Sequence, residues 1–411
     1  MFLLGEDILL KTGKRVLFGV CGIGMGHSKR SLTVAKLLRK LGFEVTFTTY
    51  NNENAEILAQ QGFEVYTVPP IFWEEDVEGN VDIRRSITSM PRLFYNFQKQ
   101  LRLEAQYIKR VNPHFIISDS RLSTAITAKI TKKPYFLINH VFRVPMPNPD
   151  LIPLGAYTRA YEIAIIWALW NLAWKHAKGI FVPDFPPPYT LSPVTLDVPF
   201  RIEDKLDYVG HVVDKIPEDL PTKDELRKEL GFDRNRPLIF VLISGNPKVK
   251  IDLERKIFHT IKNFKRDYQW VVSLGDPWRE KLFVDKGDVR ILGWLASPFE
   301  YLKACDLLIA RPGHNTVSEA IVYGKPILAI PTKGNTEYEN IARTAARLEI
   351  ARVIYSETLL KPEKVNPLID ELMTSEEVKR SVKKVQKVIA KYSGTKILVE
   401  KILDFFRGSG S

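Results

Sequence analysis

The segment from Arg15 to Ser28 reads RVLFGVCGIGMGHS, an apolar run that passes directly into a glycine-rich turn. The run Arg15–Val20 has the length and character of a buried strand, and Ser28–Leu41 has the apolar spacing of a helix. A second start of this kind lies at Leu238–Ile243 (LIFVLI), which ends in Ser244-Gly245-Asn246-Pro247. Two such strand–turn–helix starts predict two domains built on the same βα plan.

Short apolar runs separated by helical stretches continue this plan through both halves of the chain. Near-continuous apolar strands between helices are typical of a parallel sheet that is covered on both faces. We therefore expect an α/β protein with two Rossmann-like domains whose parallel sheets face each other across a cleft. The other expected strands are Phe43–Tyr50, Phe63–Val68, His114–Ser118, Tyr135–Ile138, Gly179–Val182, Trp270–Leu274, Val289–Leu292, Leu307–Ala310 and Ile327–Ile330.

A proline-rich stretch separates the two halves. Six prolines between Pro183 and Pro199 exclude a helix or a central strand there. The expected layout is an N-terminal tail (1–13), a first Rossmann-like domain (14–200), a linker (201–222), a second Rossmann-like domain (223–391), a C-terminal helix that could cross back to the first domain (392–407) and a flexible tail (408–411).

Composition excludes several classes of protein. The 411 residues are too many for one ordinary core, and 45% hydrophobic with 26% charged residues exclude disordered, collagen-like and coiled-coil chains. Cys21 and Cys305 cannot build a disulfide framework, which indicates a reducing, cytoplasmic compartment. No run reaches the roughly 18 apolar residues of a membrane span, and the N-terminal order of apolar and basic residues does not fit a signal peptide.

The net charge of +12 leaves two interpretations open. One is a basic, solvated surface, and the other is an anionic partner such as a nucleotide or an anionic lipid surface. A nucleic-acid partner is not expected, because the sequence contains no recognisable nucleic-acid-binding module.

The first glycine loop does not fit the common nucleotide motifs. His27 stands where a dinucleotide fingerprint places its third glycine, and no acidic residue follows the second strand at Thr49-Tyr50. A GxxxxGK[ST] phosphate loop is also missing. Glycines at this turn still let backbone amides approach an anionic or polar ligand closely.

His27, at the start of the first helix, is a candidate general base, because the ordinary pKa of histidine lies near neutrality. The alternative is a solvent-facing or capping histidine. Asp119 ends a strand and could orient His27, or it could cap the helix Arg121–Ile130. His140 follows the next strand in the same way and is a second candidate.

The second half holds a similar constellation after the strand Leu307–Ala310. Arg311 and the free amides of the helix that starts near His314 could bind a diphosphate. Glu319 could accept two hydrogen bonds from a ribose diol, or it could simply compensate the helix dipole. The polar loop Pro331–Asn340 should face the same end of the sheet.

These residues carry a resemblance to a known family. Arg311, Gly313, Thr316, Val317, Ser318 and Glu319 match the pattern R-x-G-x-x-T-V-S-E, and Asn315, Thr316 and Glu319 match most of N-S-x-x-E. The segment resembles the donor-binding signature of GT-B glycosyltransferases, the group of MurG, plant monogalactosyldiacylglycerol synthases and UDP-glucuronosyltransferase-like enzymes. The loop with Gly24, Gly26 and His27 resembles the family's N-terminal glycine loop, and Asp119 falls near the aspartate that orients the histidine in plant-type members.

The resemblance implies a GT-B fold and an inverting glycosyltransferase of the hexosyltransferase type, which needs no metal and no cofactor. The co-substrate would be a nucleotide-sugar, most readily a UDP-sugar. The family's donor site would correspond to Ser244, Gly245, Trp294, Leu295, Arg311, Gly313, His314, Asn315, Thr316, Glu319, Thr336 and Glu337. Trp294 and Leu295 would lie near the base, Glu319 would bind the ribose, and His27 would deprotonate an acceptor hydroxyl. Thr336-Glu337 departs from the Glu-Gln or Asp-Gln of many relatives, so the sugar stays open.

The stretch Tyr161–Trp174 (YEIAIIWALWNLAW) bears on the acceptor. Trp167, Trp170 and Trp174 are spaced to share one helical face. This face could be buried core, or it could contact a lipid or a lipid-linked acceptor, because tryptophan favours membrane interfaces. The second interpretation would place a cytoplasmic enzyme peripherally on the inner face of the cell membrane.

Two other functions remain open from the sequence. An enzyme like UDP-N-acetylglucosamine 2-epimerase would use the same fold and donor site without an acceptor. A non-catalytic nucleotide-sugar-binding or lipid-binding protein would bind UDP and turn nothing over.

Overall fold

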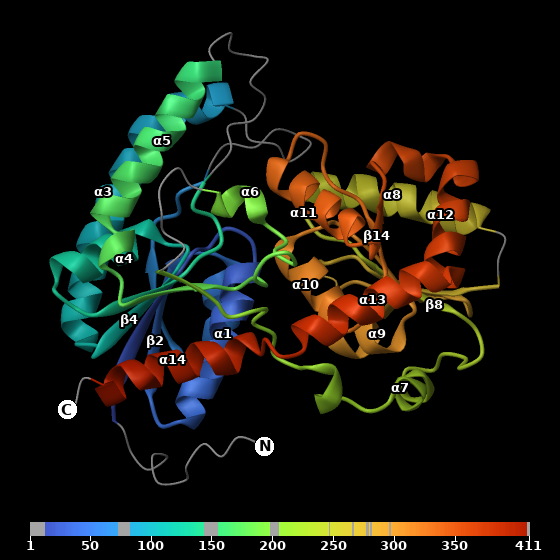
Figure 1. Cartoon of the computed structure of the whole chain (residues 1–411), viewed down its shortest axis with the longest axis horizontal. Coiled ribbons are helices and arrows are strands. Elements are labelled where there is room, and N and C mark those ends of the chain that lie inside the picture. The colour runs from blue at the N-terminus through green and yellow to red at the C-terminus, as the bar shows by residue number, and fades with distance from the viewer. Residues whose placement is uncertain are drawn as a thin grey trace.

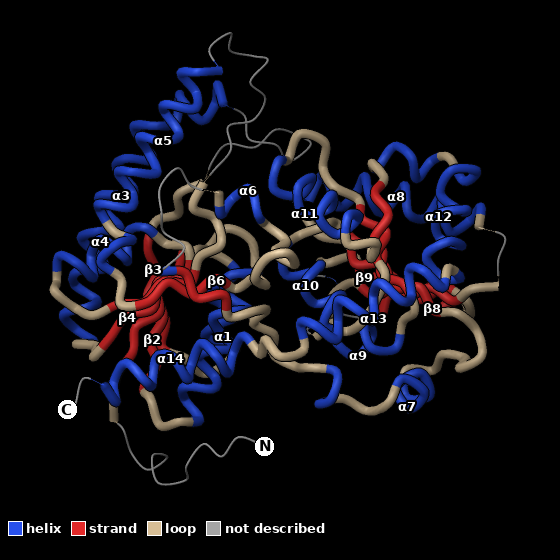
Figure 2. The backbone as a smooth tube through the Cα atoms, viewed as in Figure 1, coloured by secondary structure: helices blue, strands red, loops and turns tan. Residues whose placement is uncertain are grey.

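The computed structural model describes residues 13–72, 83–143, 155–197, 205–245, 247–264, 267–276, 279, 282–295 and 297–408. Two lobes lie side by side, and each has a central sheet with helices packed around it (Figures 1 and 2). The described chain alternates strands and helices through both lobes, as the apolar pattern predicts.

The first lobe contains a seven-stranded sheet of order β3-β2-β1-β4-β5-β6-β7 in which every strand pair is parallel. Its elements are β1 (Arg15–Val20), α1 (Gly26–Lys40), β2 (Glu44–Tyr50), α2 (Glu53–Gln60), β3 (Glu64–Val68), α3 (Ile83–Val111), β4 (Phe115–Asp119), α4 (Leu122–Ile130), β5 (Tyr135–Ile138), α5 (Gly155–Leu172), β6 (Gly179–Val182), α6 (Pro193–Leu196) and β7 (Leu206–Tyr208).

The second lobe repeats this strand order as β11-β9-β8-β12-β13-β14, with β10 added antiparallel at the edge. Its elements are α7 (Lys223–Glu229), β8 (Leu238–Leu242), α8 (Pro247–Asn263), β9 (Gln269–Ser273), β10 (Leu282–Asp285), β11 (Val289–Leu292), α9 (Phe299–Ala304), β12 (Leu307–Ala310), α10 (His314–Val322), β13 (Ile327–Ala329), α11 (Thr336–Arg347), β14 (Ala351–Val353), α12 (Pro362–Thr374) and α13 (Glu376–Ile389). One more helix follows in the chain, α14 (Gly394–Gly408).

Strand β1 is central and apolar because helices cover both faces of its sheet. Every residue from Val16 to Val20 is buried. A Cβ atom on Gly19 would lie 2.0 Å from the Thr124 hydroxyl oxygen, so a glycine is required where α4 packs against the strand. The register pairs Val20 with Asp119, which brings the ends of β1 and β4 together.

The last helix belongs structurally to the first lobe. Helix α14 packs on α1, and it runs back beneath the first sheet in Figure 1. The ring of Phe406 lies 5.0 Å from Phe115, and the ring of Phe405 lies 5.4 Å from Phe136. The chain therefore crosses between the lobes twice, once after β7 and once before α14.

The two crossings touch each other. A Cβ atom on Gly210 would lie 2.4 Å from the Cβ atom of Tyr392. A Cβ atom on Gly394 would lie 2.5 Å from the carbonyl oxygen of His211. The Thr395 hydroxyl donates to the Val213 carbonyl at 3.3 Å.

Three details differ from the sequence-based expectations. The proline-rich stretch contains one helical turn, α6, because Pro193 stands at a first helical position that needs no amide hydrogen. Strand β7 falls within the expected linker 201–222 and forms the edge of the first sheet. Helix α5 ends at Leu172, so Trp174 lies in a separate short helical turn, Trp174–His176. Of the expected tails 1–13 and 408–411, Gly408 is the last residue of helix α14, and residues 1–12 and 409–411 lie outside the described residues. The linker start at 201–204 and Asn246 also lie outside them.

Candidate functional site

The predicted pair of His27 and Asp119 is present in the first lobe. His27 lies in the first turn of α1, and Asp119 ends β4. The His27 Nδ1 atom is 2.8 Å from Asp119 Oδ1. The side chain of His27 is 21% exposed, whereas that of Asp119 is completely buried. A substrate could therefore reach the histidine, while the carboxylate acts only through its neighbours.

Asp119 is held by three side chains of α1. Arg30 donates from Nε to Asp119 Oδ2 at 3.0 Å and from Nη2 to Oδ1. The Ser31 hydroxyl donates to Oδ2 at 2.9 Å. Burial opposes ionisation of this carboxyl group, but Arg30 and His27 outweigh it and hold the pKa of Asp119 well below its ordinary value.

The alternative role of Asp119 as a helix cap is wrong. Helix α4 begins at Leu122, and its N-cap residue, Arg121, makes no side-chain cap hydrogen bond. Asp119 instead faces α1. Because an ionised carboxylate only accepts hydrogen bonds, it favours a His27 ring that donates from Nδ1 and keeps a lone pair on Nε2.

The glycine loop joins this pair to the second lobe. The Asn315 side-chain amide donates to the Gly26 carbonyl oxygen at 3.2 Å. The loop also accepts two hydrogen bonds at Gly22, from Asn52 at 2.9 Å and from Asn54 at 3.1 Å. Gly24 has a φ angle of +65°, so the turn needs a left-handed residue there. These contacts place His27 directly beside the start of α10.

Arg311 lies at the end of β12, as predicted, but it is only 6% exposed. Its Nη1 atom donates to the Ser244 carbonyl at 3.2 Å, and Nη2 donates to the Thr332 hydroxyl. Its guanidinium lies 4.8 Å from the centre of the Tyr338 ring. A Cβ atom on Gly245 would lie 2.2 Å from Arg311 Nη1, so the second glycine turn makes room for the arginine. Arg311 thus links three loops at the ends of the second sheet.

The N-terminus of α10 follows Arg311. Its N-cap is Gly313, which has no side chain to satisfy the first amides, and Thr316 lies half-buried in the first turn. His314 is buried, with Nε2 3.2 Å from Asp184 Oδ2. Asp184 follows β6 and accepts hydrogen bonds from the backbone amides of Phe185, Leu191 and Ser192. His314 therefore anchors α10 to the first lobe.

Glu319 lies further along α10, with 19% of its side chain exposed. Burial raises the pKa of Glu319 from 4.5 to about 7, although Lys29 of the first lobe opposes the shift. The Glu319 Oε1 atom is 4.0 Å from Nε2 of His211, whose pKa burial lowers well below the ordinary value. A buried carboxylate of this kind gains stability when a ligand offers it hydrogen bonds.

Glu337 begins the helix α11 together with Thr336 and meets His140 of the first lobe. The His140 Nε2 atom is 3.5 Å from Glu337 Oε1. Burial and the neighbouring His314, whose ring centre is 4.4 Å away, lower the pKa of His140 to about 4. Burial opposes ionisation of Glu337, but its hydrogen bond with His140 and the cluster of histidines around it outweigh the burial and lower the pKa of Glu337. His140 thus faces Glu337 across the interface through its Nε2 atom, and its role as a second candidate base stays a prediction.

Trp294 and Leu295 follow β11, and both are half-buried. Leu295 packs on the core of the second lobe. The Lys29 Nζ atom lies 5.4 Å from the centre of the Trp294 ring. The first lobe therefore contributes a cation next to the position expected for the nucleotide base.

The three tryptophans do not share one helical face. Trp167 is 61% exposed, and Trp170 is half-buried with Lys205 Nζ 5.6 Å from its ring centre. Trp174 is buried after the break at Ala173 and packs edge-on against Phe142. The lipid-facing interpretation therefore rests on Trp167 and its exposed neighbours on α5, which are Ile163, Ile165 and Leu172.

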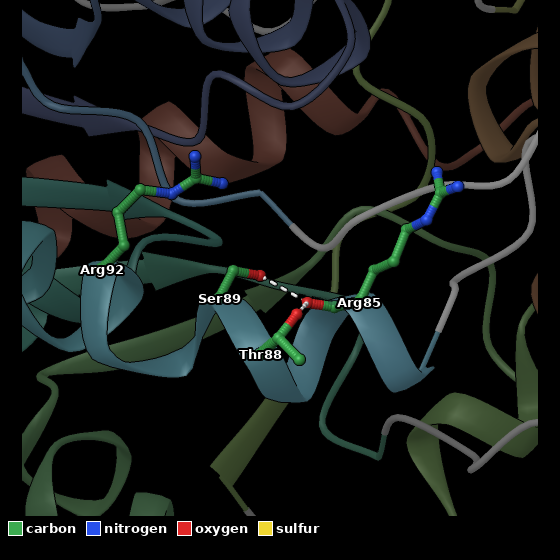
Figure 3. A pocket seen from close by; sticks show the side chains of 4 residues that line it. All are labelled: Arg85, Thr88, Ser89 and Arg92. Carbon is green, nitrogen blue, oxygen red and sulfur yellow. Dashed lines mark hydrogen bonds between the residues drawn. The ribbon is translucent and has the colours of Figure 1, made fainter.

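Helix α3 carries further exposed apolar side chains, Met90, Phe94 and Tyr95. Helices α3 and α5 both pack on the apolar core of the first lobe, through Ile108 and Ile166, and form an arm at the upper left of Figure 1. A shallow pocket on α3 is lined by Arg85, Thr88, Ser89 and Arg92, and both arginines rise from the same side of the helix (Figure 3). Basic and apolar groups are therefore neighbours on this arm.

Neither a metal-binding cluster nor a membrane-spanning helix is found among the described residues. Within the ranges given above, no group of three or more His, Cys, Asp or Glu side chains is arranged to hold a metal ion. In the same part of the chain, no helix combines the length and apolar character needed to cross a bilayer.

Sequence reasoning missed several residues of this region. Arg30 and Ser31 lie three and four positions after His27, so the helical period already placed them on its face. Lys29, Asp184 and His211 gave no such signal, because their partners are in the other lobe.

Comparisons with known proteins cover both lobes. The profile described as "Glycosyltransferase family 28 C-terminal domain" matches residues 250–397, and the profile described as "Glycosyl transferase family 1" matches residues 14–150. The first range includes Arg311, Glu319 and Glu337, and the second includes His27 and Asp119.

A relative from Thermus thermophilus is 30% identical over 312 residues, which cover 74% of this chain and 77% of the relative. It is named UDP-N-acetylglucosamine--N-acetylmuramyl-(pentapeptide) pyrophosphoryl-undecaprenol N-acetylglucosamine transferase. Among solved structures, the kitacinnamycin glycotransferase has a TM-score of 0.67 at 15% identity and covers 96% of this chain and 99% of its own. Acinetobacter baumannii MurG has a TM-score of 0.60 at 16% identity and covers 95% of this chain and 99% of its own.

Proposed function

The chain belongs to the GT-B glycosyltransferases of the group that contains MurG, and we propose that it transfers a sugar from a UDP-sugar to a hydroxyl acceptor with inversion. The observation that carries this proposal is the position of the His27–Asp119 pair directly beside the start of α10. The hydrogen bond from Asn315 to Gly26 joins the two, so a base and an anion-binding helix terminus meet at one interface.

The chemistry follows from the free nitrogen of His27. The Nδ1–H group of His27 donates a hydrogen bond to Asp119, and Nε2 accepts the proton of an acceptor hydroxyl. The acceptor oxygen then forms a bond to the anomeric carbon while the bond from that carbon to the diphosphate oxygen breaks. The bonding electron pair leaves with the diphosphate. A single displacement of this kind inverts the anomeric configuration.

The second lobe would bind the donor without a metal ion. The guanidinium of Arg311 and the amides of α10 after Gly313 supply positive charge for the leaving diphosphate. Glu319 would bind the ribose, Trp294 and Leu295 would flank the base, and Thr336 and Glu337 would contact the sugar. Arg311 already donates to the Ser244 carbonyl and to the Thr332 hydroxyl. The diphosphate would therefore replace the Thr332 hydroxyl as an acceptor, or accept a hydrogen bond from Arg311 beside the Ser244 carbonyl.

The acceptor is proposed to be linked to a lipid at an anionic membrane surface. The arm of α3 and α5 exposes apolar side chains beside arginines, a combination suited to an anionic bilayer. The name of the Thermus relative includes a pyrophosphoryl-undecaprenol acceptor. This role would place the enzyme peripherally on a membrane, with the acceptor delivered to the first lobe.

A donor screen tests the proposal. Thermal shifts are measured in EDTA with UDP, dTDP, UDP-N-acetylglucosamine and UDP-glucose, and UDP release is then followed with undecaprenyl- and dolichyl-linked acceptors in anionic vesicles. We expect UDP to stabilise the protein in EDTA, and the product anomer, read by NMR, to be inverted. Conversion of the UDP-sugar without acceptor would identify an epimerase, and binding without turnover in any assay would contradict catalysis.

A further inference from the structure

Arg30 is the most deeply buried cation next to the proposed base. It lies on α1 one turn after His27 and is only 2% exposed. Buried arginines are rare unless they are paired, because removing the charge from water is costly. The groups in contact with Arg30 should therefore indicate the role of its charge.

Among the described residues, the hydrogen bonds and the ion pair of Arg30 are all with Asp119 and His27. Its Nε and Nη2 atoms bind the two oxygens of Asp119, and Nη2 also lies 3.0 Å from His27 Nδ1. The guanidinium thus touches both members of the pair. The carboxylate is bound from two sides, by the arginine and by the imidazole.

The contacts with Arg30 provide the positive charge that the buried Asp119 carboxylate requires. A completely buried carboxylate needs a counter-charge. If His27 itself had to supply this counter-charge, it would do so as an imidazolium, which has no lone pair for an incoming proton. Arg30 supplies the counter-charge instead, so the imidazole is needed only as a hydrogen-bond donor.

We propose that Arg30 is a positioning residue that neutralises Asp119, so that Asp119 orients His27 without holding it in the protonated form. The proposal rests on the proposed role of His27 as the base. It gives the pair a third member, which acts on the reacting atoms only through Asp119 and His27.

The other charged groups near His27 do not replace Arg30. Glu337 of α11 interacts with His27 electrostatically across the interface. His140 follows β5, and its pKa is lowered to about 4, mainly by burial and by His314, with a smaller contribution from Arg30. Lys29 on the same helix is exposed and faces Trp294. Arg30 is thus the cation that contacts the carboxylate.

The chain offers a matched control in the same lobe. Arg121 is equally buried, and its Nη2 atom is 2.6 Å from Oε1 of the buried Glu104. It also donates to the carbonyl oxygens of Val20 and Thr48. A general loss of packing or of a buried ion pair should therefore appear in Arg121→Met as well as in Arg30→Met.

The test uses diethyl pyrocarbonate, which acylates an unprotonated imidazole nitrogen, on the full chain without substrate. The rate at His27 is followed by peptide mass spectrometry from pH 5 to 9, with the exposed His176 as internal reference. Removing a cation 3.0 Å from the ring favours protonation. We expect Arg30→Met and Arg30→Gln to move the half-maximal rate to higher pH by about one unit, and Asp119→Asn to move it lower. Arg30→Lys and Arg121→Met should leave it nearly unchanged.

An unchanged His27 profile in a folded Arg30→Met or Arg30→Gln protein would overturn the proposal, as would an equal shift in Arg121→Met. The transfer assay separates this result from the proposed function. If His27→Ala keeps full turnover, His27 is not the base even where the modification profile shifts. If turnover depends on His27, Arg30→Gln should lower kcat more at pH 6 than at pH 8.5 and leave the donor KM unchanged.

Discussion

The side-chain amide of Asn315 in the second lobe lies 3.2 Å from the backbone carbonyl oxygen of Gly26 in the first. Gly26 directly precedes the proposed base, and Asn315 stands four residues after Arg311 in the proposed diphosphate site. One hydrogen bond therefore connects the two halves of the proposed reaction centre. Any change in this contact should alter transfer more than it alters folding.

Gly26→Ala tests this contact. Its Cβ atom would lie 2.9 Å from Asn315 Nδ2, so the amide must move. We expect a loss in kcat of about tenfold from the displaced geometry, with little change in the melting temperature. Asn315→Ala removes the obstacle, so the double variant should be no slower than Asn315→Ala alone. Fully additive losses would show that the contact does not couple the lobes.

His27→Ala should lower turnover by about 10²- to 10⁴-fold, the usual contribution of a positioned base. UDP affinity should stay the same, because the proposed donor groups lie mainly in the second lobe. Asp119→Asn should give a smaller loss if the carboxylate only orients the ring. The checks are kcat with the acceptor found in the screen and UDP titration by calorimetry. Near-normal kcat in His27→Ala would exclude the histidine as the base.

Arg311→Met should weaken UDP binding by about 1.5–3 kcal/mol, the range for hydrogen bonds to charged groups. The loss should be the same with EDTA as with Mg²⁺, because the proposed site uses the arginine and the amides of α10 in place of a cation. Arg343→Met, on the exposed side of α11, serves as the control. A metal requirement for binding, or equal affinities in the two variants, would contradict the proposed site.

The ionised Glu319 side chain should support UDP binding and, at the same pH, lower the folding stability of the protein. Its pKa is raised from 4.5 to about 7, so the folded protein holds this proton more tightly than the unfolded chain does. Ionisation between pH 4.5 and 7 therefore costs stability, on the order of 3 kcal/mol once pH exceeds 7. Glu319→Gln should raise the free energy of unfolding at pH 8 and leave it unchanged at pH 4.5, while it weakens UDP binding at pH 8. Urea unfolding at both values measures the difference.

The exposed tryptophan of α5 predicts membrane binding. Trp167→Ser, combined with Phe94→Ser on α3, should reduce flotation with anionic vesicles, because both side chains are mostly exposed. Ile130→Ser on α4 removes an equally exposed apolar side chain elsewhere in the lobe and should have no effect. A wild-type chain that does not float, or equal losses in both proteins, would leave the arm without a lipid partner.

Much of the fold could be predicted because its strands are local apolar runs. Strand β1 spans the expected residues Arg15–Val20, and β12 spans Leu307–Ala310. Helix α3 was not predicted over its length, since Pro91 interrupts the pattern that would indicate 29 helical residues. The antiparallel strand β10 was missed because it is short and lies at a sheet edge.

The candidate site shows the same limit. The pairing of His27 with Asp119 followed from strand ends that meet at one edge of a parallel sheet. The contact of His140 with Glu337 could not be predicted, because it depends on how the second lobe is placed against the first. Likewise, the sequence placed three tryptophans on one face only by assuming that α5 continues beyond Leu172.

The paired crossings between the lobes have a mechanical consequence. The segment around Gly210 and the segment around Tyr392 touch, so the second lobe is an insertion whose two ends meet at one point of the first. A single connecting segment can rotate about its backbone bonds, but two connecting segments in contact cannot rotate independently without separating. Two touching connections should therefore oppose twisting of one lobe against the other more than bending about their contact, which would return the proposed base to the same helix terminus.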